Sequence, residues 1–212
     1  MSVISAMPPM PATATRKRVP RFLGSASFRK FTLAEYHKMI EIGVLIDGEP
    51  YELLEGYLLL KMPRSPEHDF TISAISDQLY QFVPRTFSIR GQCAATIQES
   101  EPEPDLVIAR GNVATYRHRH PGPTDTALVI EVSASSLDRD RTDKAFIYAH
   151  ASIPIYWVVN VIDRVIEVYT LPSGPSETAA YAHREDYPVG TAVPVVLDGV
   201  TVGTIPVADV MG

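Results

Sequence analysis

Apolar residues recur at helical spacing in three segments of the chain. This spacing predicts helices that begin at Thr32 and end at Gly43, that run from Glu67 to about Phe82, and that run from about Leu137 to Ala151. Thr32 and Glu35 form a capping-box pattern before the first helix, and Ser135 with Asp138 gives a similar signal before the third.

Shorter apolar and β-branched runs predict strands between these helices. Residues 51–60 are expected to form a hairpin around a Glu-Gly step, and residues 127–132 a strand buried on both faces. The other strand candidates are residues 86–90, 94–98, 105–109, 155–160, 164–169 and 192–197. This mixture of elements predicts an α/β or α+β fold with additional β-hairpins.

The first 27 residues are rich in small residues and proline and lack apolar periodicity, so we expect a flexible basic arm ahead of a single domain, residues 28–212. A chain of 212 residues with 45% hydrophobic residues can bury one substantial core and is short for two. No segment reaches the roughly 20 apolar residues that cross a bilayer, and a single cysteine, Cys93, excludes a disulfide framework. These features predict a cytoplasmic protein with no membrane partner.

Charge is distributed unevenly along the chain. Residues 1–30 hold six basic side chains and no acid, which leaves 13 basic against 25 acidic residues in the remainder. An acidic body cannot bind a nucleic-acid backbone tightly by bulk electrostatics, which excludes an architectural or histone-like role. A nuclease whose acidic site is neutralised by a metal ion stays compatible with this charge.

Two carboxylates interrupt apolar strands. Asp105 opens one strand after Pro104, and Glu131 lies inside another. A buried carboxylate is costly unless a cation, a metal ion or hydrogen-bond donors compensate it. If the two strands are neighbours, both carboxylates can converge on one Mg²⁺, with Mn²⁺ as a substitute. The plainer interpretations are a turn cap for Asp105 and a structural ion pair for Glu131.

A third carboxylate is expected from the hairpin at residues 51–60. Period-two alternation puts Glu52 and Glu55 on opposite faces of the strand, so only one of them would serve the site. Glu52 is favoured, because Glu55 stands beside the glycine of the turn, and Glu55 is the alternative.

A cation is expected from the helix that follows the Glu131 strand. Lys144 would orient or deprotonate an attacking water, and Tyr148 lies four residues further along the same face. The plainer role for Lys144 is an ion pair with Asp140 one turn earlier.

Substrate contacts are expected from a histidine and a basic loop. Residues 110–126 contain Arg117, His118, Arg119 and His120 among two glycines and two prolines, which predicts an irregular loop. Arg117 and Arg119 are candidates for substrate contacts, as are His68 near the start of its helix and Tyr148 on the helix after the Glu131 strand. A solvated loop and a helix cap are the plainer alternatives.

Seven motifs, taken together, resemble the Uma family of restriction endonucleases, which belongs to the PD-(D/E)XK nuclease superfamily. They are FTLAEY (31–36), YELLEG (51–56), PEH (66–68), PEPD (102–105), VIEVS (129–133), Lys144 with Tyr148, and IYWVV (155–159), in order over residues 31–171. The resemblance implies a restriction-endonuclease-like mixed sheet flanked by helices and a metal-dependent phosphodiesterase site.

The resemblance also implies roles for single residues. Pro104-Asp105 is the PD step, Glu131 is the acid of the (D/E)XK step, and Val132 offers a backbone carbonyl to the metal. Glu52 matches an upstream glutamate of the family. The sequence departs from the superfamily pattern at Ser133, where a lysine is usual, and Lys144 from the following helix is the substitute.

Two functions are therefore carried forward. One is a Mg²⁺-dependent endonuclease that hydrolyses DNA, and the other is a nuclease fold with little or no turnover that binds or regulates. A carboxylate-pair glycosidase is disfavoured, because the sequence offers no recognisable aromatic cleft for a sugar. Apolar strands in the second half of the chain would also allow a homodimer.

Overall fold

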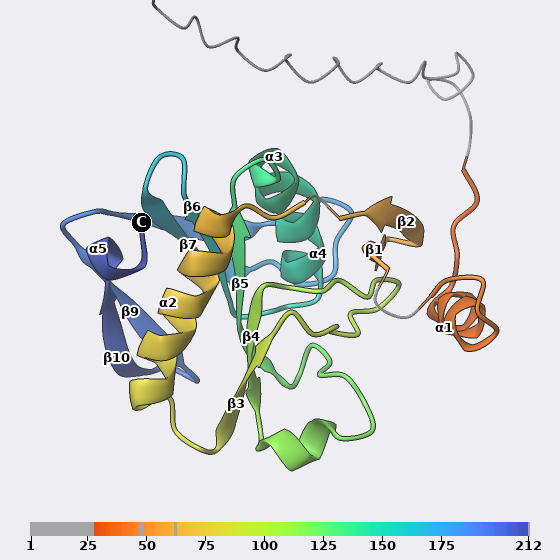
Figure 1. The fold of residues 1–212 in the computed structure, drawn as a ribbon, viewed down its shortest axis with the longest axis horizontal. Helices are drawn as coiled ribbons and strands as arrows, with labels where there is room; N and C mark the ends of the chain where they lie inside the picture. The colour runs from red at the N-terminus through yellow and green to blue at the C-terminus, as the bar shows by residue number, and fades with distance from the viewer. Residues whose placement is uncertain (1–27, 47–48, 62, 212) are drawn as a thin grey trace, which may run out of the picture.

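A six-stranded mixed sheet forms the centre of the computed structural model, which describes residues 28–46, 49–61 and 63–211 (Figure 1). The predicted basic arm, residues 1–27, lies outside the described residues. In spatial order the strands are β3 (Phe87–Gly91), β4 (Leu106–Arg110), β5 (Thr126–Ser133), β6 (Ile155–Asn160), β7 (Val165–Pro172) and β8 (Tyr181–Pro188). β5 and β6 run parallel, and the other neighbours are antiparallel.

The parallel pair requires a crossover, because parallel strands cannot be joined by a tight turn. The connection is one helical run made of α3 (Leu137–Arg139), the π-helical turn η3 (Asp140–Lys144) and α4 (Ala145–His150). The helix predicted over residues 137–151 is thus confirmed, while the π-turn is an added feature. The capping prediction was wrong: the N-cap is Ser136, and its hydroxyl donates to the Asp140 carboxylate instead of accepting from the helix.

Different elements cover the two faces of the sheet (Figure 1). On one face lie α2 (Pro66–Phe82), the hairpin of β9 (Ala192–Leu197) and β10 (Val200–Pro206), and α5 (Val207–Val210). On the other lie α4 and the hairpin of β1 (Tyr51–Leu54) and β2 (Tyr57–Leu60), with α1 (Leu33–Glu41) beside that hairpin. The described residues contain no helix of the length and apolarity that crossing a membrane requires.

The alternation of side chains along β5 determines on which face of the sheet Glu131 lies. Leu128, Ile130 and Val132 pack in the core beneath α2, whereas Val129 belongs to the core beneath α4. Because successive side chains point to opposite faces, Glu131 lies on the α4 face with Val129. All eight residues of β5 are buried, as its apolar sequence predicted.

Local sequence signals account for most other elements. The capping box of Thr32 and Glu35 is present at α1, and the predicted hairpin, α2, β6, β7 and β9 all form. The strand predicted at residues 94–98 was wrong. Its backbone donors bond to loops, since Ala95 donates to the Pro102 carbonyl and Thr96 to that of Pro121. The loop predicted over residues 110–126 contains a short 3₁₀ helix, η2 (Val113–Tyr116).

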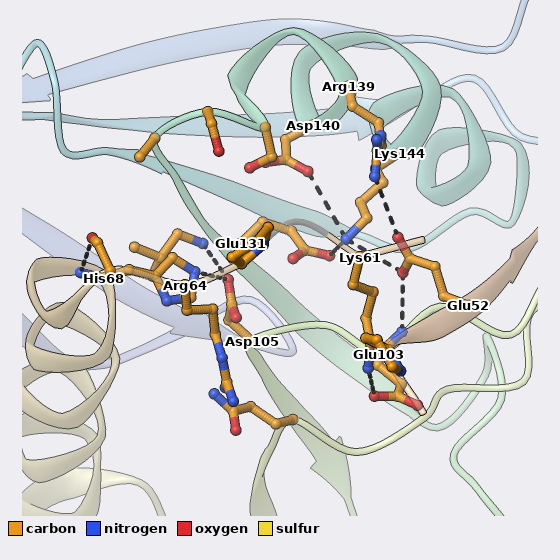
Figure 2. A pocket seen from close by; sticks show the side chains of 18 of the residues that line it. Glu52, Lys61, Arg64, His68, Glu103, Asp105, Glu131, Arg139, Asp140 and Lys144 are labelled. Atoms are coloured by element: carbon orange, nitrogen blue, oxygen red, sulfur yellow. Dashed lines mark hydrogen bonds and ion pairs between the residues drawn. The ribbon is translucent and has the colours of Figure 1, made fainter. Parts of the chain in front are cut away.

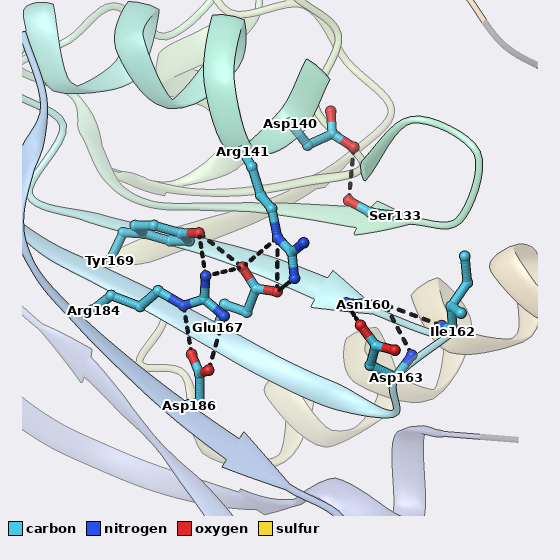
Figure 3. A network of polar contacts seen from close by, with 10 residues as sticks. All are labelled: Ser133, Asp140, Arg141, Asn160, Ile162, Asp163, Glu167, Tyr169, Arg184 and Asp186. Carbon is cyan, nitrogen blue, oxygen red and sulfur yellow. Dashed lines mark hydrogen bonds and ion pairs between the residues drawn. The ribbon is translucent and has the colours of Figure 1, made fainter. Parts of the chain in front are cut away.

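A second buried carboxylate fastens the crossover helix to the sheet (Figure 3). Glu167 of β7 is fully buried, and both of its oxygens lie 3.1 Å from Nε of Arg141 in η3. Tyr169 donates its hydroxyl to Glu167 Oε2 at 2.7 Å, and Arg184 Nη1 lies 3.4 Å from the same oxygen. Arg141 therefore ties the π-turn to β7, and the same turn ends at Lys144.

We predict that Arg141→Ala destabilises the protein by about 3 kcal/mol, because it leaves a buried carboxylate with weaker compensation. Asp186→Ala removes an exposed partner of Arg184 from the same network and is expected to cost less than about 1 kcal/mol. Urea unfolding of both variants measures the difference. Equal free energies of unfolding for the two variants would show that the Arg141 contact does not anchor the helix.

Candidate active site

A pocket of about 930 Å³ opens at the edge of the sheet where β4 begins and β5 ends. Its walls come from the hairpin, the start of α2, the β4 and β5 ends, and the start of the crossover helix. It is lined by six acidic residues, namely Glu52, Glu67, Glu103, Asp105, Glu131 and Asp140. The four cationic lining residues are Lys61, Arg64, Arg139 and Lys144, so with His68 neutral and all six carboxylates ionised the formal net charge of the lining is −2.

Asp105 occupies the place where β5 extends past its neighbour. The register pairs Leu106 with Ile130, so the last residues of β5 have no β4 partner. Asp105 Oδ2 accepts the Val132 N–H at 2.7 Å and lies 3.2 Å from His68 Nε2. The carboxylate thus accepts a backbone hydrogen bond that a neighbouring strand would otherwise accept, and it lies beside Glu131 (Figure 2).

Glu131 is compensated by two groups from the crossover helix. Lys144 Nζ donates to Glu131 Oε1 at 2.9 Å, and the Tyr148 hydroxyl donates to the same oxygen at 2.7 Å. All three side chains are buried. Burial raises the pKa of Glu131, and the charge of Lys144 acts in the opposite direction. The spacing of Lys144 and Tyr148 predicted in the sequence therefore places both on one carboxylate.

The ammonium group of Lys144 also faces two further carboxylates (Figure 2). Nζ lies 3.6 Å from Glu52 Oε2 and 3.9 Å from Asp140 Oδ1. Burial lowers the pKa of Lys144, but the charges of Glu131, Glu52 and Asp140 outweigh it and raise the pKa above its ordinary value. Lys144 therefore stays protonated at neutral pH and can orient a water molecule, whereas deprotonating one would require the neutral amine.

The hairpin places its two glutamates differently. Glu52 is buried, lines the pocket and accepts the Glu103 N–H at 3.5 Å. Glu55 is exposed at the turn with a φ of +49°, a conformation compatible with a turn residue. Only Glu52 reaches the pocket.

Asp140 belongs to the pocket although the sequence suggested it only as an ion-pair partner. Its Oδ2 accepts the hydroxyls of Ser133 at 2.7 Å and Ser136 at 2.6 Å. Its backbone carbonyl, in the π-turn, accepts the Tyr156 hydroxyl at 3.0 Å. The sequence offered two signals for Asp140. One was its i, i+4 spacing to Lys144, and the other was the serine at residue 133, where the resemblance implies a lysine.

The donor atoms of the pocket fit a hard divalent cation. In the described part of the chain, Asp105 Oδ1 and Glu131 Oε2 accept no hydrogen bond, so each carboxylate keeps one oxygen for a ligand. The Val132 carbonyl leaves β5 on the same side as its N–H, toward Asp105. No group of three or more His, Cys, Asp or Glu side chains among these residues could hold a metal alone. Two carboxylates, a carbonyl and water molecules match the binding mode of Mg²⁺.

The predicted substrate residues divide into those that line the pocket and those that do not. Tyr148 does not, because it is fully buried against Glu131. His68 lines the pocket, and its pKa is raised: burial lowers it, but hydrogen bonding to Asp105 and the charges of Asp105 and Asp69 outweigh that effect. Arg117 is exposed on the loop after η2 and does not line the pocket. Arg119 also lies outside it, where it forms a two-point ion pair with Asp125 at 2.5 and 2.9 Å.

Some pocket residues were missed because they lie on loops or at element ends. Arg64 precedes α2, Lys61 follows β2, and Glu103 stands in the turn before β4. The Glu103 carboxylate forms an ion pair with Lys61. Arg139, on α3, lies beside Glu52. None shows a periodic pattern, so only the tertiary path of the chain brings them to the site.

Comparison with known proteins supports the fold and identifies the family. A crystal structure described as "a putative nuclease belonging to DUF820 from Anabaena variabilis ATCC 29413" superposes with a TM-score of 0.64 at 16% identity, over 85% of this chain and 97% of that one. This likeness shows a shared fold. No curated protein matches the chain. The family model Uma2, described as "Putative restriction endonuclease", matches residues 33–202, and because that match spans the hairpin, the sheet and every pocket residue discussed above, the chain belongs to the Uma2 family.

Proposed function

We propose that this protein is a Mg²⁺-dependent endonuclease that hydrolyses phosphodiester bonds of DNA, with the activity carried by one domain, residues 28–212. The observation that carries the proposal is that Asp105 and Glu131 line one pocket at the ends of β4 and β5. Among the described residues, one oxygen of each carboxylate accepts no hydrogen bond. The family membership supports a nuclease, and the net charge of −2 in the lining supports a divalent ion.

The chain's own residues divide the work. Asp105, Glu131 and the Val132 carbonyl would hold the ion, for which Mn²⁺ is a substitute. When bound, such an ion polarises the phosphodiester and offsets the charge of the leaving oxygen. Lys144 donates hydrogen bonds as an ammonium group and would orient the attacking water or stabilise the developing negative charge. Glu52 holds Lys144 from the side opposite Glu131.

Two further properties belong to the same proposal. A single cysteine supports a reducing, cytoplasmic environment. The position of β8 as an outermost strand of the six-stranded sheet supports a homodimer through strands of the second half of the chain, because an edge strand can pair with another chain.

The competing function is a metal-binding module of the same fold that does not turn over. The specific observation in its favour is that three carboxylates face the ammonium group of Lys144, so its positive charge is already balanced within the protein. Metal binding without cleavage of any DNA would select this alternative.

We predict that Asp105→Asn and Glu131→Gln each lower Mg²⁺-dependent DNA cleavage by at least about 100-fold, because each removes a charged ligand oxygen. Glu67→Gln, which changes an exposed acid at the pocket rim, is the matched control and is expected to leave the rate unchanged. Single-turnover cleavage of plasmid and oligonucleotide DNA measures all three. Full activity in both site variants would refute the mechanism.

A second prediction concerns metal binding without reference to turnover. Mg²⁺ at 100 times its dissociation constant should stabilise the native state by about 2.7 kcal/mol. For a chain of this size that corresponds to about 5 to 10 °C in the thermal midpoint. The shift should disappear in Asp105→Asn and persist in Glu67→Gln. A shift of equal size in all three proteins would place the ion elsewhere.

A third prediction separates the two hairpin glutamates. Glu52→Gln should lower cleavage about 10- to 100-fold, because it weakens the hold on Lys144 as the loss of an outer-shell partner does at metal sites. Glu55→Gln should retain the wild-type rate, since its side chain lies at the exposed turn. Rate constants at saturating Mg²⁺ decide between them, and the reverse order of effects would assign the role to Glu55.

A further inference from the structure

Two of the four cations in the pocket are already engaged. Lys144 is buried and faces Glu131, Glu52 and Asp140. Lys61 forms an ion pair with the Glu103 carboxylate. Both ammonium groups therefore already lie against carboxylates of the protein, whereas the two arginines of the pocket are more loosely held.

The two arginines are only loosely held. Arg64 Nε lies 3.7 Å from Asp69 Oδ1, and Arg139 Nη1 lies 4.0 Å from Glu52 Oε1. Across the described ranges of the chain, neither guanidinium makes a hydrogen bond at normal distance. Their side chains are 47% and 26% exposed, respectively, so each side chain is partly accessible from the pocket that it lines. Each guanidinium carries five donors in a planar fork that matches a phosphate group.

The arginines also come from opposite walls of the pocket. Arg64 stands on the segment before α2, near Asp69 of that helix, whereas Arg139 stands on α3, beside Glu52 (Figure 2). The carboxylates of Asp105 and Glu131 lie between them. A strand whose scissile phosphate sits at these carboxylates would extend toward both walls, so its neighbouring phosphates would meet one guanidinium on each side.

We propose that Arg64 and Arg139 form a two-point clamp for the backbone phosphates on either side of the scissile bond. This inference rests on the proposed nuclease function and identifies its substrate contacts. The clamp reads the charge of the backbone and not the base edges, so it binds a nucleic-acid strand independently of sequence. The clamp would also provide the substrate contacts that the sequence suggested for Arg117 and Arg119, which lie outside the pocket.

The test measures binding of a fluorescein-labelled single-stranded oligothymidylate by fluorescence anisotropy. The salt concentration is varied between about 50 and 200 mM, a range over which phosphate contacts change the affinity. Ca²⁺ replaces Mg²⁺ to suppress cleavage. Arg64→Ala and Arg139→Ala should each weaken binding about tenfold and reduce the slope of log K against log salt by about 0.7, the value for one phosphate contact on a single strand. The double variant should lose about twice that slope. Arg139→Lys should keep the slope but weaken binding, because a lysine retains the charge without the fork.

Arg85→Ala is the matched control, because it removes an exposed arginine beyond the far end of α2. Its salt slope should equal that of the wild type, and thermal midpoints should show that every variant is folded. Unchanged slopes in Arg64→Ala and Arg139→Ala, an equal loss in Arg85→Ala, or no binding by the wild type would overturn the clamp. Reduced slopes together with no cleavage in Mg²⁺ would support the clamp and refute the proposed hydrolysis, whereas cleavage with unchanged slopes would do the opposite.

Discussion

Burial of the Glu131 carboxylate is the constraint around which the site is organised. β5 lies in the middle of the sheet and is buried along its whole length, so an ionised side chain there is costly without donors. The donors come from the crossover helix, which a parallel β5–β6 pair needs in any case. Lys144 and Tyr148 therefore connect the topology of the sheet to the chemistry of the pocket, because both bond to the same oxygen of Glu131.

The crossover helix must also be attached to the sheet so that Lys144 and Tyr148 reach Glu131. Arg141 provides one attachment, to the buried Glu167 of β7. Asp140 provides another, through the hydroxyls of Ser133 and Ser136. Both attachments lie in or next to the π-turn, whose wider hydrogen-bonding pattern is frequently found at functional sites. Asp140 and Lys144 are the first and last residues of this turn, so its geometry sets the spacing between them.

Sequence reasoning predicted the site where the signal was a violation of an apolar pattern, as at Asp105 and Glu131, or a helical spacing, as at Lys144 and Tyr148. These signals depend on local periodicity, which the sheet and the helix preserve. Charge density alone was a poor guide: the basic loop at residues 110–126 contains Arg119, which forms an ion pair with Asp125 and lies outside the pocket. Arg64 and Glu103 carry no pattern, and the loops that bring them to the pocket follow from tertiary packing. The same limit explains the mistaken strand at residues 94–98: Ala95 and Ile97 are buried in the core as strand residues would be, but the backbone of the segment bonds to loops.

The serine at the superfamily's lysine position has a physical explanation. Ser133 lies two residues after Glu131, on the same face of β5 and fully buried beneath the crossover helix. A lysine there would bring its ammonium group to the place that the π-turn occupies, where Lys144 already faces three carboxylates. A small hydroxyl instead leaves room for Asp140 and donates to it. The cation that contacts Glu131 therefore comes from the helix and not from the strand, and its position depends on how the helix is attached to the sheet.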